Sequence, residues 1–406
     1  MKSSFLVKNA AYALFALFSN LVFAAALPPG YPPELYDEGK VPQFTLPDPL
    51  VMLNGDKVND VNTWKQKRRP EILKLFETNV YGRTMIGRPD AMTWKVTAEN
   101  RSDINGIAIT KTVTIYFTSK TDGPALSGVE GPKMDVNIVL PASATQKPAP
   151  LIAIVEWSPQ KQWLLDRGYG LATFDAAQIE PDIKTGSYEK SIRKFFAKPD
   201  QNTPGPDEWG AIGAWAWGLS RAMDYIVTDK EIDANKVCVA GFSRFGKAAV
   251  WAGAQDQRFA IVFSGESGCG GAVLVRRGFG ETVKIINYKF PHWFCPNFKT
   301  YGDRVNDLPV DWHMLIALMA PRPVYIATAE QDLFGDPRGS FLSGKYAEPV
   351  YQLFGEKGLD TNDMPPLETP VGDTIGYHIR KGTHNLTDYD WQQFLNFADR
   401  HFHRSK

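Results

Sequence analysis

A short segment near the middle of the chain has the residue pattern of a nucleophilic serine. Residues 241–247 read Gly-Phe-Ser-Arg-Phe-Gly-Lys, with Ser243 between two glycines. A β-branched run, 236–240, precedes the segment and a helix-forming run, 248–254, follows it. A sharp strand-to-helix turn of this kind exposes a serine hydroxyl at the edge of a sheet. The segment therefore predicts acyl transfer, although its Gly-x-Ser-x-x-Gly spacing is one residue longer than the common pattern.

A serine nucleophile needs a base, and the sequence offers one well-placed histidine. His384 follows an apolar run, 376–379, and lies in a loop made adaptable by Gly382. In serine hydrolases built on a parallel sheet, the acid and then the histidine follow the serine on loops after strands. His384 is therefore the predicted base. The other five histidines fall in a predicted strand, in the last helix or in apolar surroundings: His292, His313, His378, His401 and His403.

Two carboxylates compete to orient this histidine. Glu266 follows the apolar strand at 260–263, and Asp332 follows the next one at 324–328. Both positions are loops at strand ends, so both side chains could reach His384. Sequence chemistry alone leaves the choice open, because either residue could instead cap its loop.

The elements that must position these residues follow two patterns. Alternating apolar residues between 92 and 140, interrupted by a loop at 122–132, predict antiparallel strands. Beyond residue 148, continuous apolar runs alternate with helical stretches, which predicts an α/β fold with a mostly parallel central sheet covered on both faces. The predicted strands are 151–155, 171–174, 237–240, 260–263, 324–328 and 376–379, and the predicted helices are 211–227, 246–254 and 389–402.

The N-terminal 90 residues contain three kinds of segment. Residues 1–26 combine a basic start, a short apolar run and three alanines, which predicts a cleaved signal peptide and a secreted or periplasmic protein. A proline-rich extended segment, 28–53, follows, and then an amphipathic helix at 60–80 whose basic cluster is expected to face solvent: Lys65, Lys67, Arg68 and Arg69. The remaining chain, 27–406, is expected to form a single catalytic domain with an N-terminal extension at 27–90.

The amino-acid composition limits which binding partners, cofactors and disulfides are expected. The 45 basic and 45 acidic residues give zero net charge, so nucleic acid and anionic membranes are not expected partners. The sequence shows neither a metal-ligand pattern nor a glycine-rich phosphate loop, and no metal or organic cofactor is predicted. The odd number of cysteines, three, allows at most one internal disulfide, and Cys269 and Cys295 are the expected pair. Cys238, inside a predicted strand, is expected to be a buried thiol.

The motifs resemble those of the glucuronoyl esterases, carbohydrate esterase family 15, bacterial type. The family's Gly-x-Ser-Arg-x-Gly-Lys elbow matches 241–247, its Glu-Ser-Gly segment matches 266–268, and its late Gly-x-His segment matches 382–384. Further similarity at 68–82, 290–294 and 320–323 extends the resemblance over most of the chain. It implies an α/β-hydrolase three-layer sandwich with N-terminal antiparallel strands, and it ranks Glu266 first as the acid with Asp332 as an auxiliary.

The resemblance also implies roles for residues around the serine. Arg244 would stabilise the oxyanion through its backbone N–H and its guanidinium. Lys247, one helical turn beyond Ser243, would donate hydrogen bonds to sugar hydroxyls, and Glu281 would accept them. Phe334 stands where family members usually carry a tryptophan, so it keeps a stacking face and loses the indole donor.

The expected protein is a secreted, monomeric serine esterase without a cofactor. The resemblance implies that it cleaves esters of glucuronic or 4-O-methylglucuronic acid, the bonds that join glucuronoxylan to lignin alcohols. Two alternatives remain: an esterase of the same fold acting on acetylated xylan or another carbohydrate ester, and a non-catalytic polysaccharide-binding relative. The intact set of serine, histidine and acid favours an enzyme.

Overall fold

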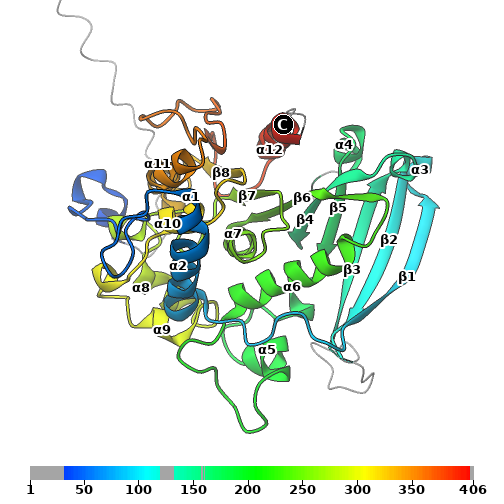
Figure 1. Cartoon of the computed structure of the whole chain (residues 1–406), viewed down its shortest axis with the longest axis horizontal. Coiled ribbons are helices and arrows are strands. Elements are labelled where there is room, and N and C mark those ends of the chain that lie inside the picture. The colour runs from blue at the N-terminus through cyan, green and yellow to red at the C-terminus, as the bar shows by residue number, and fades with distance from the viewer. Residues whose placement is uncertain (1–31, 119–131, 157–158, 160, 403–406) are drawn as a thin grey trace, which may run out of the picture.

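The structure is a computed structural model that describes residues 32–118, 132–156, 159 and 161–402 (Figure 1). The predicted signal peptide, 1–26, and most of the predicted loop at 122–132 lie outside the described residues. Within these ranges, every helix is too short or too polar to cross a membrane.

The described strands form one nine-stranded sheet in the order β1-β2-β3-β5-β4-β6-β7-β8-β9. Strands β1, β2, β3 and β5 pair antiparallel in that order, and all pairs from β5 to β9 are parallel. The strands are β1 Thr93–Ser102, β2 Ala108–Tyr116, β3 Lys133–Pro141, β4 Ala149–Val155, β5 Gly170–Phe174, β6 Ile232–Phe242, β7 Ile261–Gly265, β8 Val324–Ala329 and β9 Ile375–Arg380. The predicted change from antiparallel to parallel strands is therefore confirmed.

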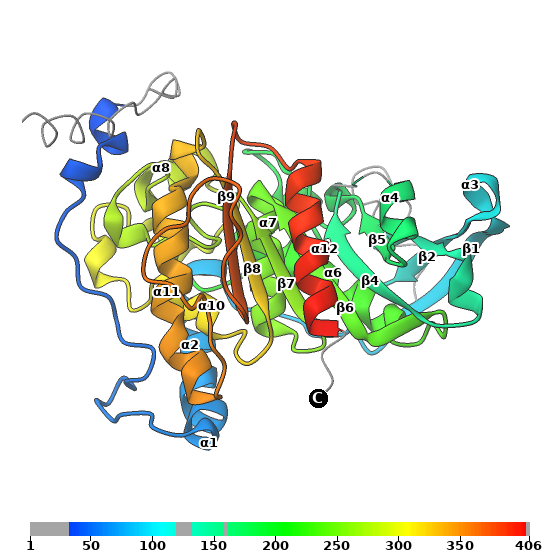
Figure 2. The same cartoon turned by 90° about the horizontal axis from the view of Figure 1, so that it is seen from above.

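Helices cover both faces of the sheet (Figures 1 and 2). One face packs against α6, α7 and α10 through side chains such as Trp215, Trp251 and Leu315. The other face packs against α4 and α12 through Leu164 and Trp391. The helices are α1 Val61–Thr63, α2 Arg69–Phe76, α3 Asp103–Gly106, α4 Lys161–Asp166, α5 Ile192–Phe195, α6 Ala211–Ile226, α7 Ser243–Gln255, α8 Val283–Lys289, α9 Pro296–Lys299, α10 Trp312–Ala317, α11 Pro337–Leu353 and α12 Asp388–Phe402.

The predicted N-terminal helix forms, but half of its basic cluster is buried. The stretch 61–81 consists of α1, α2 and two π-helical turns. Lys65 and Lys67 are exposed as expected, whereas the expectation for Arg68 and Arg69 was wrong. The Arg68 guanidinium donates to the carbonyl of Pro49 at 3.0 Å, and the Arg69 Nη2 donates to that of Ala254 at 2.6 Å. These arginines join the N-terminal segment to the domain because they satisfy buried carbonyl groups.

The cysteines also differ from the expectation. All three are described, buried and free, so the predicted Cys269–Cys295 disulfide is wrong. The Cys295 thiol instead faces the carbonyl oxygen of Thr78 at 3.8 Å. Cys238 is a buried thiol inside β6, as expected.

The loops that follow the parallel strands lie at one edge of the sheet. The carboxyl ends of β6, β7, β8 and β9 lead directly to Ser243, Glu266, Asp332 and His384. Neighbouring parallel strands end on the same side, so residues far apart in sequence converge there. These four residues, together with the predicted Arg244, consequently line one pocket.

Candidate active site

Ser243 lies at the sharp turn where β6 becomes α7. Its φ is +54°, a left-handed conformation that strains a residue with a side chain. At Gly241, a Cβ atom would lie 2.0 Å from the carbonyl oxygen of Phe245, so only glycine fits. The turn places Ser243 at the N-terminus of α7, where backbone N–H groups of the first turn lack helical acceptors. The geometry exposes a hydroxyl beside a ready group of donors.

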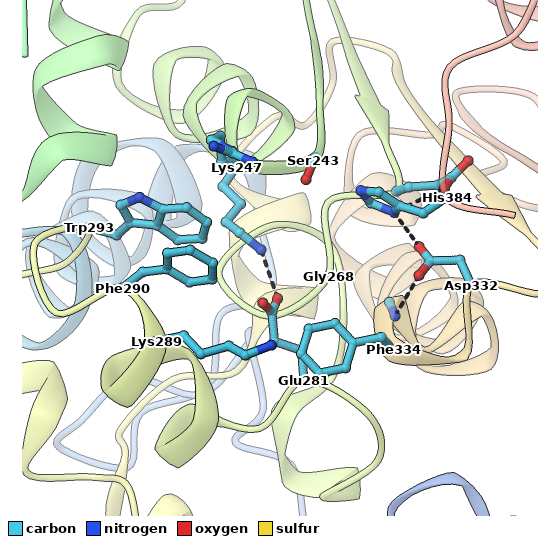
Figure 3. Close-up of a pocket in the computed structure, with 13 residues that line it drawn as sticks. Ser243, Lys247, Gly268, Glu281, Lys289, Phe290, Trp293, Asp332, Phe334 and His384 are labelled. Atoms are coloured by element: carbon cyan, nitrogen blue, oxygen red, sulfur yellow. Dashed lines mark hydrogen bonds and ion pairs between the residues drawn. The ribbon is translucent and has the colours of Figure 1, made fainter. Parts of the chain in front are cut away.

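His384 faces the serine from the loop after β9 (Figure 3). Its Nδ1 lies 2.8 Å from Oδ2 of Asp332 and 3.2 Å from Oε2 of Glu266. A carboxylate accepts hydrogen bonds, so Nδ1 carries a proton, and in the neutral ring Nε2 has a free lone pair. The side chain is 42% exposed, which leaves the ring open to the pocket. This arrangement suits a general base.

Glu266 is buried and tied by several groups. One carboxylate oxygen accepts a hydrogen bond from the backbone N–H of Asn385 at 3.1 Å, and the other pairs with Arg380. The Arg380 guanidinium also donates to the carbonyls of Thr383, at 3.1 Å, and of Asn385. Arg380 thus connects the buried acid to the loop that carries His384. Its own Nε donates to Asp390 in α12 at 2.9 Å.

The charged groups around His384 shift one another's pKa values. Burial raises the pKa of Glu266 to about 7, and the contact with His384 opposes the rise while the charge on Asp332 adds to it. Burial alone would lower the pKa of His384, but the contacts with Asp332 and Glu266 outweigh it and raise the pKa to about 9. The two acids together stabilise the imidazolium form.

Asp332 makes the shorter contact with the histidine. It accepts from His384 through Oδ2, and its Oδ1 accepts from the backbone N–H of Gly335 at 3.3 Å. The contact to Asp332 is 2.8 Å and the contact to Glu266 is 3.2 Å, so Asp332 is the nearer acid in the structure. Both carboxylates reach His384, as expected for either, and their ranking stays a prediction.

The opposite wall of the pocket carries a buried ion pair. Lys247 lies on α7 one turn beyond Ser243, and its Nζ donates to Glu281 at 2.9 Å and to the carbonyl of Ser267 at 2.7 Å. Both side chains are at least nine-tenths buried, yet both line the pocket. A ligand with hydroxyl groups would meet a donor and an acceptor held side by side (Figure 3).

Arg244 occupies the wall beside the elbow. Its Nη1 pairs with Asp182, and its guanidinium lies 5.6 Å from the ring centre of Trp293. The side chain is 41% exposed and lines the pocket. A cation in this place can meet negative charge that develops next to Ser243.

Aromatic rings and one further lysine complete the pocket, whose volume is ≈ 310 Å³. Phe290 stacks on Trp293 with ring centres 3.7 Å apart. Phe334 lies on the far side, and the Nζ of Lys289 is 5.0 Å from its ring centre. The volume suits a small molecule. The complete lining is Ser243, Arg244, Lys247, Glu266, Gly268, Glu281, Lys289, Phe290, Trp293, Asp332, Phe334, Gly335 and His384.

All eight predicted site residues line this one pocket, whereas sequence reasoning missed several neighbours. Lys289, Phe290 and Trp293 fall in a segment whose aromatic richness was visible but not assigned to the site. Arg380 lies at the end of β9 and Asp182 in a polar loop, and neither position shows a local pattern.

The acid cluster could also be considered as a metal site. Ligand atoms of Glu266, Asp332 and His384 lie within 4.8 Å of one another. However, Nδ1 of His384 already donates to Asp332, and the positive Arg380 pairs with Glu266. A nearby guanidinium repels a cation and a protonated nitrogen cannot bind one, so these contacts suit proton transfer better.

Comparison with known proteins places this pocket in a family. A family model described as glucuronyl esterase, fungi, matches residues 127–355. Carbohydrate esterase MZ0003, from an unknown prokaryotic organism, is 42% identical over 409 residues, covering 90% of this chain and 91% of that protein. The chain belongs to the glucuronoyl esterase family. This confirms the resemblance found in the elbow and loop motifs.

Two further matches agree in fold and class. The solved structure titled glucuronoyl esterase from Solibacter usitatus is 44% identical with a TM-score of 0.83, covering 89% of this chain and 99% of that one. A 4-O-methyl-glucuronoyl methylesterase of Hypocrea jecorina (strain QM6a) is 29% identical over 327 residues, and the match spans 76% of this chain and 62% of that protein. The α/β-hydrolase fold is thereby confirmed, and the chain is a carboxylic ester hydrolase.

Proposed function

We propose that this esterase hydrolyses esters of glucuronic and 4-O-methylglucuronic acid by a serine mechanism. One observation carries the proposal: His384, hydrogen-bonded to acid through Nδ1, shares a pocket with Ser243 at a strained elbow. The family membership supports the substrate class. The natural substrates would be the ester links between glucuronoxylan and lignin alcohols, reached after export directed by residues 1–26.

In the first half-reaction, Ser243 Oγ attacks the C6 carbonyl carbon of the uronate while Nε2 of His384 takes its proton. The imidazolium that forms is stabilised by Asp332 and Glu266, which already contact Nδ1. The Arg244 guanidinium and the N–H groups at the start of α7 stabilise the oxyanion. Collapse of the intermediate breaks the C6–O bond to the alcohol, which leaves with the proton from Nε2.

In the second half-reaction, water replaces the alcohol. His384 removes a proton from the water as its oxygen attacks the acyl carbon, and the proton then passes to the departing Ser243 oxygen. The products are the free uronic acid and the regenerated serine. No redox group or metal enters this balance.

The wall formed by Lys247 and Glu281 would recognise the sugar. Lys247 can donate to one hydroxyl and Glu281 can accept from another, because the two are adjacent and fixed by their own contact. Phe334 offers an apolar ring face to the sugar from the neighbouring side.

A panel of esters on the purified protein tests the proposal. We expect hydrolysis of methyl and benzyl glucuronoate to exceed that of acetylated xylan and simple acetyl esters in kcat/KM. Ser243→Ala should abolish turnover, whereas the surface control Ser143→Ala should not. Equal or reversed rates on acetyl esters would refute the substrate, and turnover by Ser243→Ala would refute the nucleophile.

A further inference from the structure

Asp182 lies at the centre of a small hydrogen-bonded cluster behind Arg244. Its Oδ1 accepts from Nε2 of His292 at 2.8 Å and from Nε1 of Trp293 at 2.7 Å. Its Oδ2 pairs with Nη1 of Arg244. Three donors from two distant parts of the chain therefore share one carboxylate. Burial would raise its pKa, but these donors outweigh burial and lower the pKa to about 2.

The loop that carries Asp182 is itself firmly held. Two residues earlier, the fully buried Glu180 pairs with Arg193, whose Nε is 2.5 Å from Oε2. The Glu180 carbonyl accepts from the Trp215 indole at 2.9 Å, which fixes the loop to α6. Pro181 then restricts the backbone between Glu180 and Asp182. The carboxylate is thus placed by rigid elements, as a supporting group must be.

The Arg244 side chain, by contrast, has little other support. Among the hydrogen bonds of the described residues, its guanidinium uses only Nη1, which goes to Asp182. No hydrogen bond from its Nε or Nη2 is found within the part of the chain that the structure describes, so these donors can reach a ligand in the pocket. A long side chain that is 41% exposed samples many rotamers unless one end is fixed. Asp182 supplies the contact that fixes it, and the ring of Trp293 supplies a flat surface beneath it.

We infer that Asp182 is the positioning residue for the oxyanion-binding guanidinium of Arg244, with His292 and Trp293 holding the carboxylate in place. The inference rests on the proposed function, because it assigns Arg244 to the oxyanion. Asp182 does not touch the substrate in this role. It lowers the free energy of the transition state by keeping the N–H donors of Arg244 aimed before charge develops.

A double-mutant cycle that combines Asp182→Asn with Arg244→Met, measured with methyl glucuronoate as substrate, tests this positioning role. Arg244→Met should lower kcat by about 100-fold, as loss of an oxyanion donor does. Asp182→Asn keeps the shape of the side chain and should lower kcat by about tenfold with KM nearly unchanged, because misplaced donors weaken only the transition state. In the Arg244→Met background the same substitution should change kcat by less than about twofold.

Asp207→Asn is the matched control. Asp207 pairs with Arg83 at 2.6 Å outside the pocket at similar exposure, so its loss should leave kcat unchanged. His292→Leu gives a second route if Asp182→Asn folds poorly: it removes one donor to Asp182 and should lower kcat by a smaller factor, again only when Arg244 is present.

The possible failures are distinguishable. A large effect of Arg244→Met with full activity in both Asp182→Asn and His292→Leu overturns the inference and leaves the proposed function intact. Additive effects of Asp182→Asn and Arg244→Met overturn it as well, since Asp182 would then act through another group. Wild-type rates in Arg244→Met or Ser243→Ala would instead overturn the mechanism on which the inference rests.

Discussion

Two of the walls of the pocket, the His384 wall and the Arg244 wall, differ in how they hold charged side chains. On the His384 wall, the side chains of Glu266 and Arg380 are only 2% and 3% exposed and pair with each other. On the Arg244 wall, the guanidinium is 41% exposed and is fixed at one end. Proton transfer benefits from charges fixed in a water-poor environment, whereas an oxyanion site must keep donors unoccupied until charge appears. Under the proposed mechanism, the two walls would therefore act at different steps of the reaction.

The comparison predicts different kinetic signatures. Substitutions on the His384 wall should change kcat and its pH dependence, because they alter proton transfer. Substitutions on the wall formed by Lys247 and Glu281 should mainly change KM, because they alter sugar binding. Four sets of substitutions test this separation, beginning with the largest expected effect.

His384→Ala removes the base and should lower kcat by about 10⁵-fold, as loss of a member of a serine triad does. Steady-state rates on methyl glucuronoate measure the loss. His401→Ala, in α12, serves as the control and should retain wild-type kcat. A loss of less than tenfold in His384→Ala would assign the base to another residue.

Asp332→Asn should lower kcat and move the acid limb of the pH profile to lower pH. Catalysis needs neutral His384, whose raised pKa of about 9 makes kcat/KM rise with pH toward that value. Loss of the 2.8 Å partner destabilises the imidazolium, so the limb should move down by about one pH unit or more. Glu266→Gln, which changes a 3.2 Å contact, should move it less. A larger shift in Glu266→Gln would support Glu266 as the principal acid, as the resemblance implies.

Lys247→Met should raise KM by about tenfold with a smaller change in kcat, since a charge-assisted hydrogen bond to the sugar is lost. Glu281→Gln, which keeps the side-chain volume, should show the same pattern more weakly. Thermal unfolding of each variant shows whether the fold tolerates the loss of one member of the buried Lys247–Glu281 pair. A fall in kcat at unchanged KM would place Lys247 in the chemical step and break the separation between the walls.

Phe334→Trp should have the smallest effect. The indole preserves the ring face and adds an N–H donor, so KM for methyl glucuronoate should fall by about threefold or less at constant kcat. Phe334→Leu is the companion that removes the ring and should raise KM. An unchanged KM in both variants would show that the ring packs the loop and does not contact the sugar.

Patterns local in sequence were enough to predict the sheet and to identify residues that share the candidate pocket. Apolar strand runs identified the sheet, and the glycines around Ser243 identified the elbow because the turn forbids a Cβ there. His384 was found by its place after the last strand. These features depend on near neighbours, which a sequence displays directly.

Contacts between distant segments were not predictable. Arg380 contacts Glu266, 114 positions away, and Asp182 contacts Arg244, 62 positions away. Arg68 and Arg69 share a helical stretch with exposed lysines, yet both are buried and donate hydrogen bonds to carbonyl groups of other segments. Whether a charged side chain is buried can be predicted only when its distant partners are known.

The free cysteines give the folded state a chemical marker. Burial raises the pKa of Cys295 to about 11 and also raises the pKa values of Cys238 and Cys269, so none presents a thiolate near neutral pH. A thiol reagent should therefore react slowly with the native protein. It should modify three thiols per chain once the protein unfolds. The alkylation rate then reports how often the core opens, and unchanged melting under a reductant would show that no crosslink supports the fold.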